Sequence, residues 1–248
     1  PVALSFPTRR SSDLDILVHC FYHRMGLHKG HPVLSVRWPI SSMPKDTVNE
    51  VYGGNVFSLG STNTVLIRDG DMNIILDPGI LQLGRYGSLK KRLDEFDLTS
   101  DDIDLVINSH CHYDHVEANY MFRGKPLIIH EKELEYTDQL YWPEWREAFL
   151  GIMDIKPVKG DHKITENIRV IETVGHTPGS ITTLVETDEG LVALVGDAVI
   201  VKEDLLELRP PSVVTKNIAA EVAVNSLKKI RSLNPVLVVP GHDAPFSP

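Results

Sequence analysis

Cysteine and long apolar segments are scarce in this sequence of 248 residues. Its 2 cysteines, Cys20 and Cys111, lie far apart, which excludes a disulfide framework and favours a reducing compartment, so we expect a cytoplasmic protein. The longest apolar runs, residues 190–196 and 235–240, are much shorter than the ~18 residues that a membrane-spanning helix needs. The sequence therefore predicts no membrane-spanning segment.

Positive charge is also in deficit. The chain has 25 Lys and Arg against 34 Asp and Glu, which gives a formal net charge of −9. Binding to nucleic acid through general attraction to phosphates needs the opposite sign, so a nucleic-acid partner is disfavoured. What is present is a globular composition, 42% hydrophobic and 24% charged, in a chain long enough for one large domain.

The first residues are unlike the rest of the chain. The sequence begins at Pro1, and residues 5–14 resemble one reading frame of a common sequencing-library adapter. We therefore expect residues 1–14 to be a non-native leader and residues 15–248 to form a single domain. A short basic, serine-rich leader is the alternative interpretation.

Short apolar runs alternate with amphipathic segments along the chain. Residues 65–68 and 73–76 flank an Asp-Gly-Asp turn, which predicts a hairpin. Further strands are expected at residues 105–108, 127–130, 168–171, 181–185, 191–195 and 236–239, and helices at 88–96, 116–122, 131–140 and 219–233. This order predicts an α/β domain with two covered sheets.

Three of the 11 histidines lie within residues 109–115, directly after a predicted strand. His110 and His112 alternate to the same side of an extended segment, so both imidazoles can reach one metal ion. Asp114 and His115 follow where the chain turns and can face a second ion. A loop at the end of a buried strand gives such side chains a rigid base and access to solvent. This density of ligands favours a metal site over a polar loop with incidental histidines.

Three more candidate ligands, His176, Asp197 and His242, each follow a predicted strand. Each is flanked by glycine or proline, which permit tight turns and a close approach of backbone to a metal. Taken alone, each is an ordinary turn or surface residue. With the four groups of the 110–115 loop they make seven, the number that two metal ions sharing one bridging carboxylate need.

The motif His-x-His-x-Asp-His at residues 110–115, followed in order by His176, Asp197 and His242, resembles the signature of the metallo-β-lactamase-fold hydrolases. The resemblance runs from about Tyr52 to His242. It implies an α/β fold, a four-layer αβ/βα sandwich, with the metals at one edge in the loops that join strands to helices.

The resemblance also implies an assignment of the ligands. One ion would be held by His110, His112 and His176, the other by Asp114, His115 and His242, with Asp197 between them. Imidazole and carboxylate ligands suit two Zn²⁺ ions, with Fe or Mn as alternatives. Asp77 matches a family aspartate that typically supports the site, since an acceptor fixes the second N–H of a ligand imidazole. A plain strand-to-turn aspartate is the other interpretation.

The expected chemistry follows from the two ions. Two dications about 3.5 Å apart lower the pKa of a bridging water toward 7 and make hydroxide available as a nucleophile. Asp114 is placed both to bind metal and to carry a proton to the leaving group, which makes it the candidate catalytic residue. We therefore expect a dinuclear metal-dependent hydrolase that uses a metal-bridging hydroxide on a small-molecule lactone or ester.

Other substrates stay open. Lactonases that open acyl-homoserine lactones resemble this chain in length and ligand set, but carry a tyrosine where this chain has Ile200. Thioesterases of the glyoxalase II type usually carry another histidine where Ser180 stands, and add a C-terminal helical region where six residues follow His242 here. A β-lactamase, a phosphodiesterase or ribonuclease-like relative, and a non-catalytic metal-binding scaffold are the remaining alternatives.

Several features have no assigned part in this chemistry. Cys111 lies between two candidate ligands and is expected to pack away from the metals. The histidines of residues 19–31, with Cys20, match no closed zinc motif, so surface or packing roles are expected, and structural roles are expected for His130 and His162. Aromatic residues concentrated within residues 122–149 predict either an apolar wall beside the metals, core packing, or a homodimer contact.

Overall fold

Two mixed β-sheets organise the computed structural model, which describes residues 13–18, 23–28, 31–34, 56–59, 62–79, 89–140, 143–211 and 217–248. The first sheet contains, in spatial order, β1 (Asp13–Val18), β5 (Thr64–Asp69), β6 (Met72–Leu76), β7 (Leu105–Ile107), β8 (Pro126–His130) and β9 (Asp154–Val158). The second contains β10 (His162–Lys163), β11 (Ile168–Glu172), β12 (Ile181–Thr187), β13 (Gly190–Gly196) and β14 (Leu237–Pro240).

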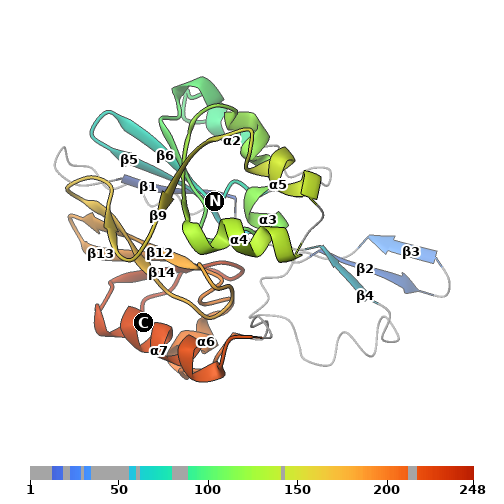
Figure 1. Ribbon diagram of the computed structural model, residues 1–248, viewed down its shortest axis with the longest axis vertical. Coiled ribbons are helices and arrows are strands. Elements are labelled where there is room, and N and C mark those ends of the chain that lie inside the picture. The colour runs from blue at the N-terminus through green and yellow to red at the C-terminus, as the bar shows by residue number, and fades with distance from the viewer. Residues whose placement is uncertain are drawn as a thin grey trace.

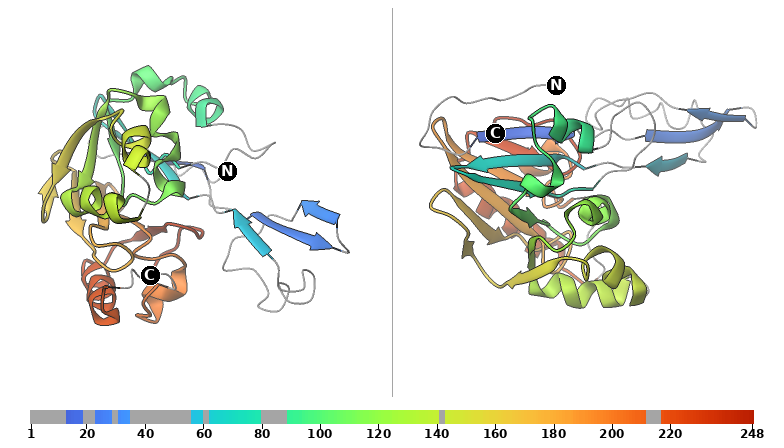
Figure 2. Two further views of the ribbon diagram at one scale, coloured as in Figure 1. Left: turned by 45° about the vertical axis from the view of Figure 1, so that its right-hand side comes forward. Right: turned by 90° about the horizontal axis from the view of Figure 1, so that it is seen from above.

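A smaller sheet is formed by β3 (His31–Leu34), β2 (His23–His28) and β4 (Val56–Leu59). Figures 1 and 2 show it standing away from the two large sheets. The candidate ligands all belong to the part of the chain that follows it.

The two large sheets pack face to face around an apolar core. Alternate residues along each strand point to opposite faces, so Val65 and Ile67 of β5 face the second sheet while Leu66 faces outward. Val170 of β11 and Leu194 of β13 enter the same core from the other side. These side chains are at most 1% exposed, and each such burial contributes about 1.5–3 kcal/mol relative to exposure.

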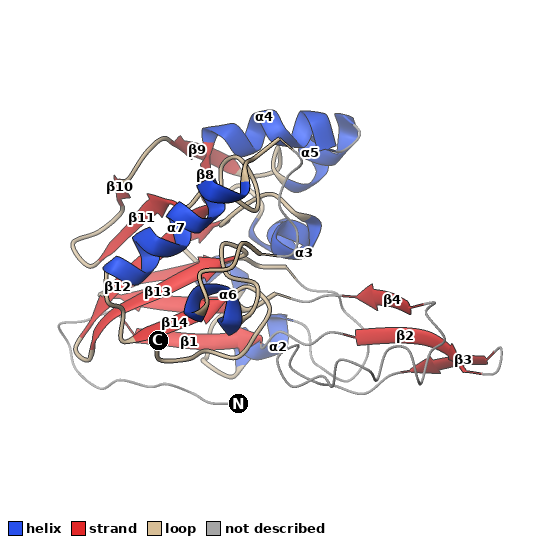
Figure 3. Cartoon of the chain, turned by 90° about the horizontal axis from the view of Figure 1, so that it is seen from below, coloured by secondary structure: helices blue, strands red, loops and turns tan. Residues whose placement is uncertain are grey.

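Helices cover the outer faces of both sheets. On the first sheet these are α2 (Leu89–Asp94), α3 (Tyr113–Val116), the 3-10 helix η4 (Glu117–Phe122), α4 (Glu131–Leu140) and α5 (Pro143–Phe149), which pack around Phe122 and Trp145. On the second they are α6 (Lys202–Leu206) and α7 (Ala220–Ser232), whose Leu205, Leu227 and Ile230 are buried. Figure 3 shows these helices flanking the strands. The four-layer αβ/βα sandwich is confirmed.

Strand direction places the ends of the central strands at one edge. β6, β7 and β8 run parallel to one another, and so do β13 and β14. The carboxyl ends of parallel neighbours meet at the same edge of a sheet, where open α/β sheets bind their ligands. The 110–115 loop and the loops that follow β13 and β14 leave the sheets at such ends.

The hairpin at β5 and β6 and the strands β7, β8 and β11 to β14 agree with the sequence pattern, with differences of at most two residues at their ends. The helix expected at residues 116–122 is found as the 3-10 helix η4. It is preceded by the short helix α3, whose first turn places Asp114 at the positive end of the helix dipole. β1 to β4, β9, β10, α5 and α6 were not expected. Among the described helices, none is both long and apolar enough to cross a bilayer.

Two expectations about the N-terminal region stay predictions. β1 begins at Asp13 and pairs with β5, so the expected boundary at residue 14 falls inside a strand, but residues 1–12 lie outside the described residues. His19 and Cys20 also lie outside them.

Candidate metal centre

The first four candidate ligands lie where β7 gives way to α3. His110 and His115 are fully buried, whereas His112 and Asp114 are partly exposed. His112 caps α3 in an extended backbone conformation, so Asp114 and His115 are carried by the first turn of that helix. The buried strand therefore fixes one end of this short segment and the helix fixes the other.

The remaining three candidate ligands come from the second sheet. His176 follows β11, Asp197 directly follows β13, and His242 lies two residues past β14. The backbone N–H of Gly241 donates to the carbonyl of Gly196 at 2.9 Å, which holds the last two of these loops together. All three side chains are buried, with exposures of 3%, 6% and 4%.

The structure brings all seven candidate ligands to one place. Their donor atoms form overlapping groups within 4.8 Å, each of which could hold a metal ion. We call His110, His112 and His176 the three-histidine group, and Asp114, His115 and His242 the aspartate–histidine group. The expected convergence of residues from both sheets is what the structure shows, while their role as ligands stays a proposal.

Asp197 lies between the two groups. Its Oδ2 atom is 3.3 Å from Nε2 of His176 in the three-histidine group. Its Oδ1 atom is 3.3 Å from Nε2 of His115 and 3.2 Å from Nε2 of His242 in the aspartate–histidine group. One oxygen of the carboxylate thus faces each group, as a bridging position requires.

The buried polar atoms fit two bound cations. Within the described part of the chain, Nε2 of His110 is buried without a hydrogen-bond partner, and so are Nε2 of His115 and Oδ1 of Asp197 apart from ion-pair contacts at 3.2–3.3 Å. Such atoms are expensive to leave unpaired, and each is a metal-binding atom type. Nε2 of His176 and Nδ1 of His112 lie 2.8 Å apart, a hydrogen-bond distance at which one ring nitrogen donates to the other, so both atoms face the same point.

Burial and neighbouring charge favour the neutral form of His110 and His112, two members of the three-histidine group. Burial, and then the nearby His115, hold the pKa of His110 well below its usual value. Burial and the adjacent His176 lower the pKa of His112 to about 4. Neutral imidazole is the form that binds metal.

Carboxylates have the opposite effect on His115. Burial disfavours its charge, but Asp197 and Asp77 outweigh burial and raise the pKa of His115 to about 10. Burial alone would raise the pKa of Asp197, but the surrounding histidines, His242 first, hold it well below its usual value. Without metal, a protonated imidazole therefore partly compensates the buried carboxylates.

Asp77 contacts one of the candidate ligands, and its supporting role stays a proposal. It is buried, and its Oδ2 atom lies 2.9 Å from Nδ1 of His115. Its oxygens also accept hydrogen bonds from the backbone N–H of Ser109 at 2.7 Å and the Ser109 hydroxyl at 2.6 Å. The backbone of Asp77 has φ 48°, a left-handed conformation that aspartate tolerates better than most residues. Nδ1 of His115 is thereby oriented, which points its Nε2 into the site.

Sequence reasoning missed two polar residues beside the ligands. The Oγ atom of Ser109 lies 3.0 Å from Nδ1 of His110. The position of Ser109 directly before the first candidate histidine was the sequence feature that could have identified it. Glu133 is fully buried in α4. The sequence feature that could have identified it is the i, i+3 and i+4 spacing that places Glu133 on one helix face with Tyr136 and Thr137.

The other expectations for this region are resolved in part. Cys111 is buried in the apolar cluster between the first sheet and its helices. Burial, and to a lesser extent the nearby Glu133, raise the pKa of its thiol. Phe122 and Trp145 are core residues, each 1% exposed. The Tyr136 ring lies 6.1 Å from the His112 ring, while Tyr141 and Trp142 lie outside the described residues. His130 bonds Glu172 at 2.7 Å and joins β8 to β11.

Comparison with known proteins decides the family. The sequence pattern of the metallo-beta-lactamase superfamily matches residues 58–242. The chain belongs to this superfamily. The match includes all seven candidate ligands, from His110 to His242.

Curated relatives and solved structures agree with this membership. A probable metallo-hydrolase of Methanocaldococcus jannaschii is 35% identical over 62% of this chain and 63% of its own length. An N-acyl homoserine lactonase of Bacillus cereus is 31% identical over 58% of this chain and 57% of its own. The matches thus span about three fifths of these relatives.

One solved structure is an N-acyl homoserine lactone hydrolase with the product N-hexanoyl-L-homoserine bound at its catalytic metal centre. It superposes with a TM-score of 0.68, covering 96% of this chain and 94% of that one, at 21% identity. This likeness establishes the shared fold.

Proposed function

We propose that this protein is a dinuclear metal-dependent hydrolase that acts on a small-molecule lactone or ester. The observation that carries the proposal is the convergence of seven side chains from two sheets, with buried metal-binding atoms that have no hydrogen-bond partner among the described residues. Family membership and the similarity to metallo-hydrolases and lactonases support it.

The donor set suggests how two ions would be held. The three-histidine group would hold one ion and the aspartate–histidine group the other, with Asp197 shared. The mixture of imidazole and carboxylate favours Zn²⁺, and Fe or Mn accept the same donors. When bound, two such ions lower the pKa of water toward neutrality and polarise the oxygen of a substrate carbonyl.

Asp114 is the residue of this site best placed to move a proton. Its side chain is 28% exposed, whereas that of Asp197 is 6% exposed. Its Oδ2 atom is 3.3 Å from Nε2 of His242, so one carboxylate faces both the buried ligands and the solvent side. A carboxylate in this position can take a proton from the attacking water and deliver it to the leaving alkoxide.

Similarity to lactonases and the acidic net charge favour a carbonyl substrate, whose identity the hydrolysis panel below would determine. Similarity to lactonases supports a lactone. Ile200, which is 7% exposed, offers no hydroxyl at the position where lactonases carry a tyrosine, so substrate binding must differ there. The acidic net charge of −9 disfavours phosphodiesters of RNA or DNA. Cytoplasmic location and a homodimer stay predictions from the sequence.

The test is metal analysis followed by a hydrolysis panel. We expect about two divalent ions per chain, and faster turnover of lactones or simple esters than of thioesters, β-lactams or phosphodiesters. General acid–base catalysis typically contributes about 10²–10⁴-fold, so Asp114→Asn should lower kcat by about that factor while the fold persists.

Two results would contradict the proposal. Carbonyl hydrolysis that survives Asp114→Asn unchanged would show that the residue has no part in proton transfer. Two bound ions without turnover of any substrate class would favour a metal-binding scaffold instead.

A further inference from the structure

A buried carboxylate outside the seven candidate ligands joins two of their loops. Glu133 lies in the first turn of α4, and its side chain is completely buried. Its Oε2 atom accepts a hydrogen bond from the backbone N–H of Cys111 at 2.9 Å, and its Oε1 atom accepts one from the N–H of Gly179 at 2.7 Å. Cys111 lies between the first two candidate histidines, and Gly179 lies three residues past His176.

We propose that Glu133 is a positioning residue that sets the metal affinity of the three-histidine group and leaves the aspartate–histidine group unaffected. The inference rests on the proposed function, because it assumes that the two groups bind metal. It assigns Glu133 a part in one of the two subsites.

The contacts of Glu133 explain this selectivity. The three-histidine group is split between the loop after β7 and the loop after β11, so its geometry depends on how these loops lie against each other. Zinc needs its nitrogen ligands at about 2.0–2.1 Å, which leaves little freedom between them. A backbone hydrogen bond from Ile181 to Ser109, at 2.9 Å, joins the bases of the loops, whereas Glu133 joins them at the ligands.

Glu133 packs tightly against the backbone of Gly179. A Cβ atom on Gly179 would lie 2.9 Å from Cγ, Oε1 and the backbone N of Glu133. A glycine is therefore needed at residue 179 for the loop to come this close. The close contact between the Glu133 side chain and this loop therefore depends on glycine at residue 179.

The charge of Glu133 supplies a second reason. A buried carboxylate is costly unless hydrogen bonds satisfy it, and each oxygen here receives a charge-assisted bond from a different loop. Apart from the shared Asp197, the three-histidine group offers a dication only imidazoles, whereas the aspartate–histidine group also contains Asp114. Glu133 therefore adds negative charge beside the group that has no carboxylate of its own.

The test uses the full chain freed of metal with a chelator and titrated with Zn²⁺ against a competing indicator. Outer partners of metal ligands typically contribute about 10–100-fold in affinity. We expect Glu133→Gln, which replaces one acceptor with a donor facing an N–H, to weaken one of two binding steps by about this factor. The other step should keep the wild-type affinity, and the visible spectrum of the Co²⁺-loaded variant should change.

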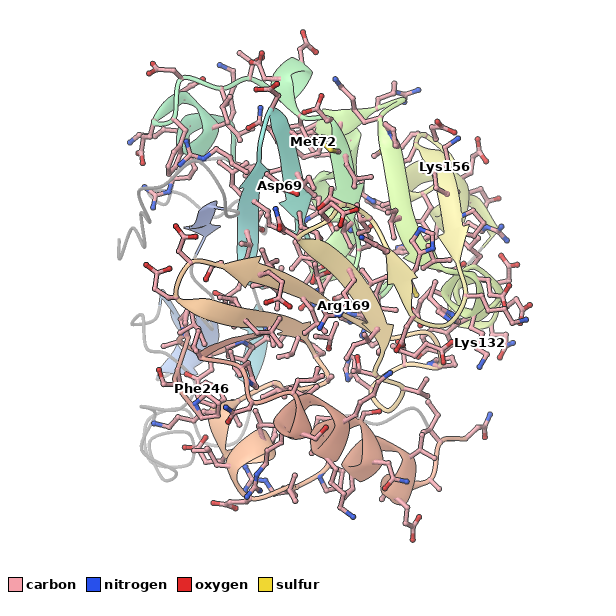
Figure 4. The ribbon with its side chains drawn as sticks, turned by 90° about the vertical axis from the view of Figure 1, so that its left-hand side faces the viewer. Asp69, Met72, Lys132, Lys156, Arg169 and Phe246 are labelled. Carbon is pink, nitrogen blue, oxygen red and sulfur yellow. The ribbon has the colours of Figure 1, made fainter. Side chains whose placement is uncertain are left out.

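A matched control separates positioning from general loss of stability. Asp69 also accepts two hydrogen bonds across the sheets, from Thr165 and Asn167. It ends β5 beside the turn to β6, where Figure 4 labels it near Met72, and β6 runs from this turn toward Asp77 and the candidate ligands. Asp69→Asn should lower the melting temperature and leave both Zn²⁺ affinities at the wild-type values.

A second variant breaks the same contact from the other side. Gly179→Ala pushes the loop away from Glu133 without changing the carboxylate, so it should weaken the same single binding step. If Glu133→Gln does not fold, the Zn²⁺ titration of Gly179→Ala tests the proposal in its place.

The outcomes are distinguishable from those of the proposed function. A wild-type chain that binds no Zn²⁺ overturns both proposals. A wild-type chain that binds two ions, with Glu133→Gln and Gly179→Ala binding both as tightly or losing both equally, overturns only the role of Glu133.

Discussion

At the scale of single residues, Asp197 is the side chain through which the two candidate ligand groups meet. It contacts His176 with one oxygen and His115 and His242 with the other. Because it is almost completely buried, its charge is screened little by solvent. Any change in the protonation of these neighbours therefore alters the charge of the whole site.

His115 leads to a prediction about pH. Its pKa of about 10 means that it is protonated at pH 7 without metal, and a metal can bind Nε2 only after that proton leaves. Zn²⁺ binding should therefore release a proton from His115, and affinity should rise by up to about tenfold per pH unit below pH 10.

Calorimetry in buffers of different ionisation enthalpy measures this proton release. Asp77→Asn removes one of the carboxylates that raise the pKa of His115, so this variant should release a smaller fraction of a proton at pH 8 to 9. Zn²⁺ binding whose heat is independent of the buffer would contradict the assignment.

The positions of the candidate ligands could be predicted because each follows a short apolar run and stands in a local motif with histidine, glycine or proline. Glu133 and Ser109 could not be predicted in the same way. Their partners are backbone N–H groups and a carboxylate 22 to 46 residues distant, and such contacts leave no periodic pattern in a sequence.

At the scale of elements, the loops after the strands position the site because they are short and closely packed. The packing at Gly241 is an example. A Cβ atom at this position would overlap Oδ1 of Asp197, so the loop after β14 passes directly over the shared carboxylate. Glycine is required here by space, since its φ is not in the left-handed region.

Gly241→Ala should therefore displace Asp197 and weaken the binding of both ions, by roughly 10–100-fold. Zn²⁺ titration of the metal-free variant measures the loss. Gly70→Ala is the control: Gly70 has φ 62° in the β5–β6 turn, and no described residue would contact its Cβ within 4 Å. It should cost about 1 kcal/mol of stability and no metal affinity. Equal metal binding by both variants would refute the role of Gly241.

The elements themselves could largely be predicted from the sequence. Buried strands such as β13 are continuous apolar runs, and α7 has a clear apolar face that includes Leu227 and Ile230. β9 was missed because it contains Pro157 and is exposed at three of its five positions. An edge strand of this kind tolerates proline and lacks an apolar signal.

At the scale of the whole molecule, the candidate ligands come from both halves of the sandwich. The first sheet and its helix α3 carry four of them, and the second sheet carries three. Bound ions would therefore join two layers that otherwise meet through the apolar core and a few polar contacts. Binding of metal to the folded state alone stabilises that state by mass action.

Removal of metal should thus lower the melting temperature. At a free Zn²⁺ concentration of 100 times Kd the stabilisation is about 2.7 kcal/mol, which corresponds to roughly 5–10 °C in a chain of this size. Thermal unfolding followed by circular dichroism, with Zn²⁺ or with chelator, measures the shift. Identical melting curves would show that the ions do not join the two halves.

The direction of β6 and β13 has a practical consequence. β13 leads to Asp197, and β6 leads to Asp77, which contacts His115. The exposed turns from which these strands start, at Gly70 and at Asp188, therefore lie at the opposite rim. A fluorophore, a surface anchor or an inserted peptide attached at either turn would lie away from the candidate ligands. The same rim offers positions at which the protein can be immobilised for repeated assay.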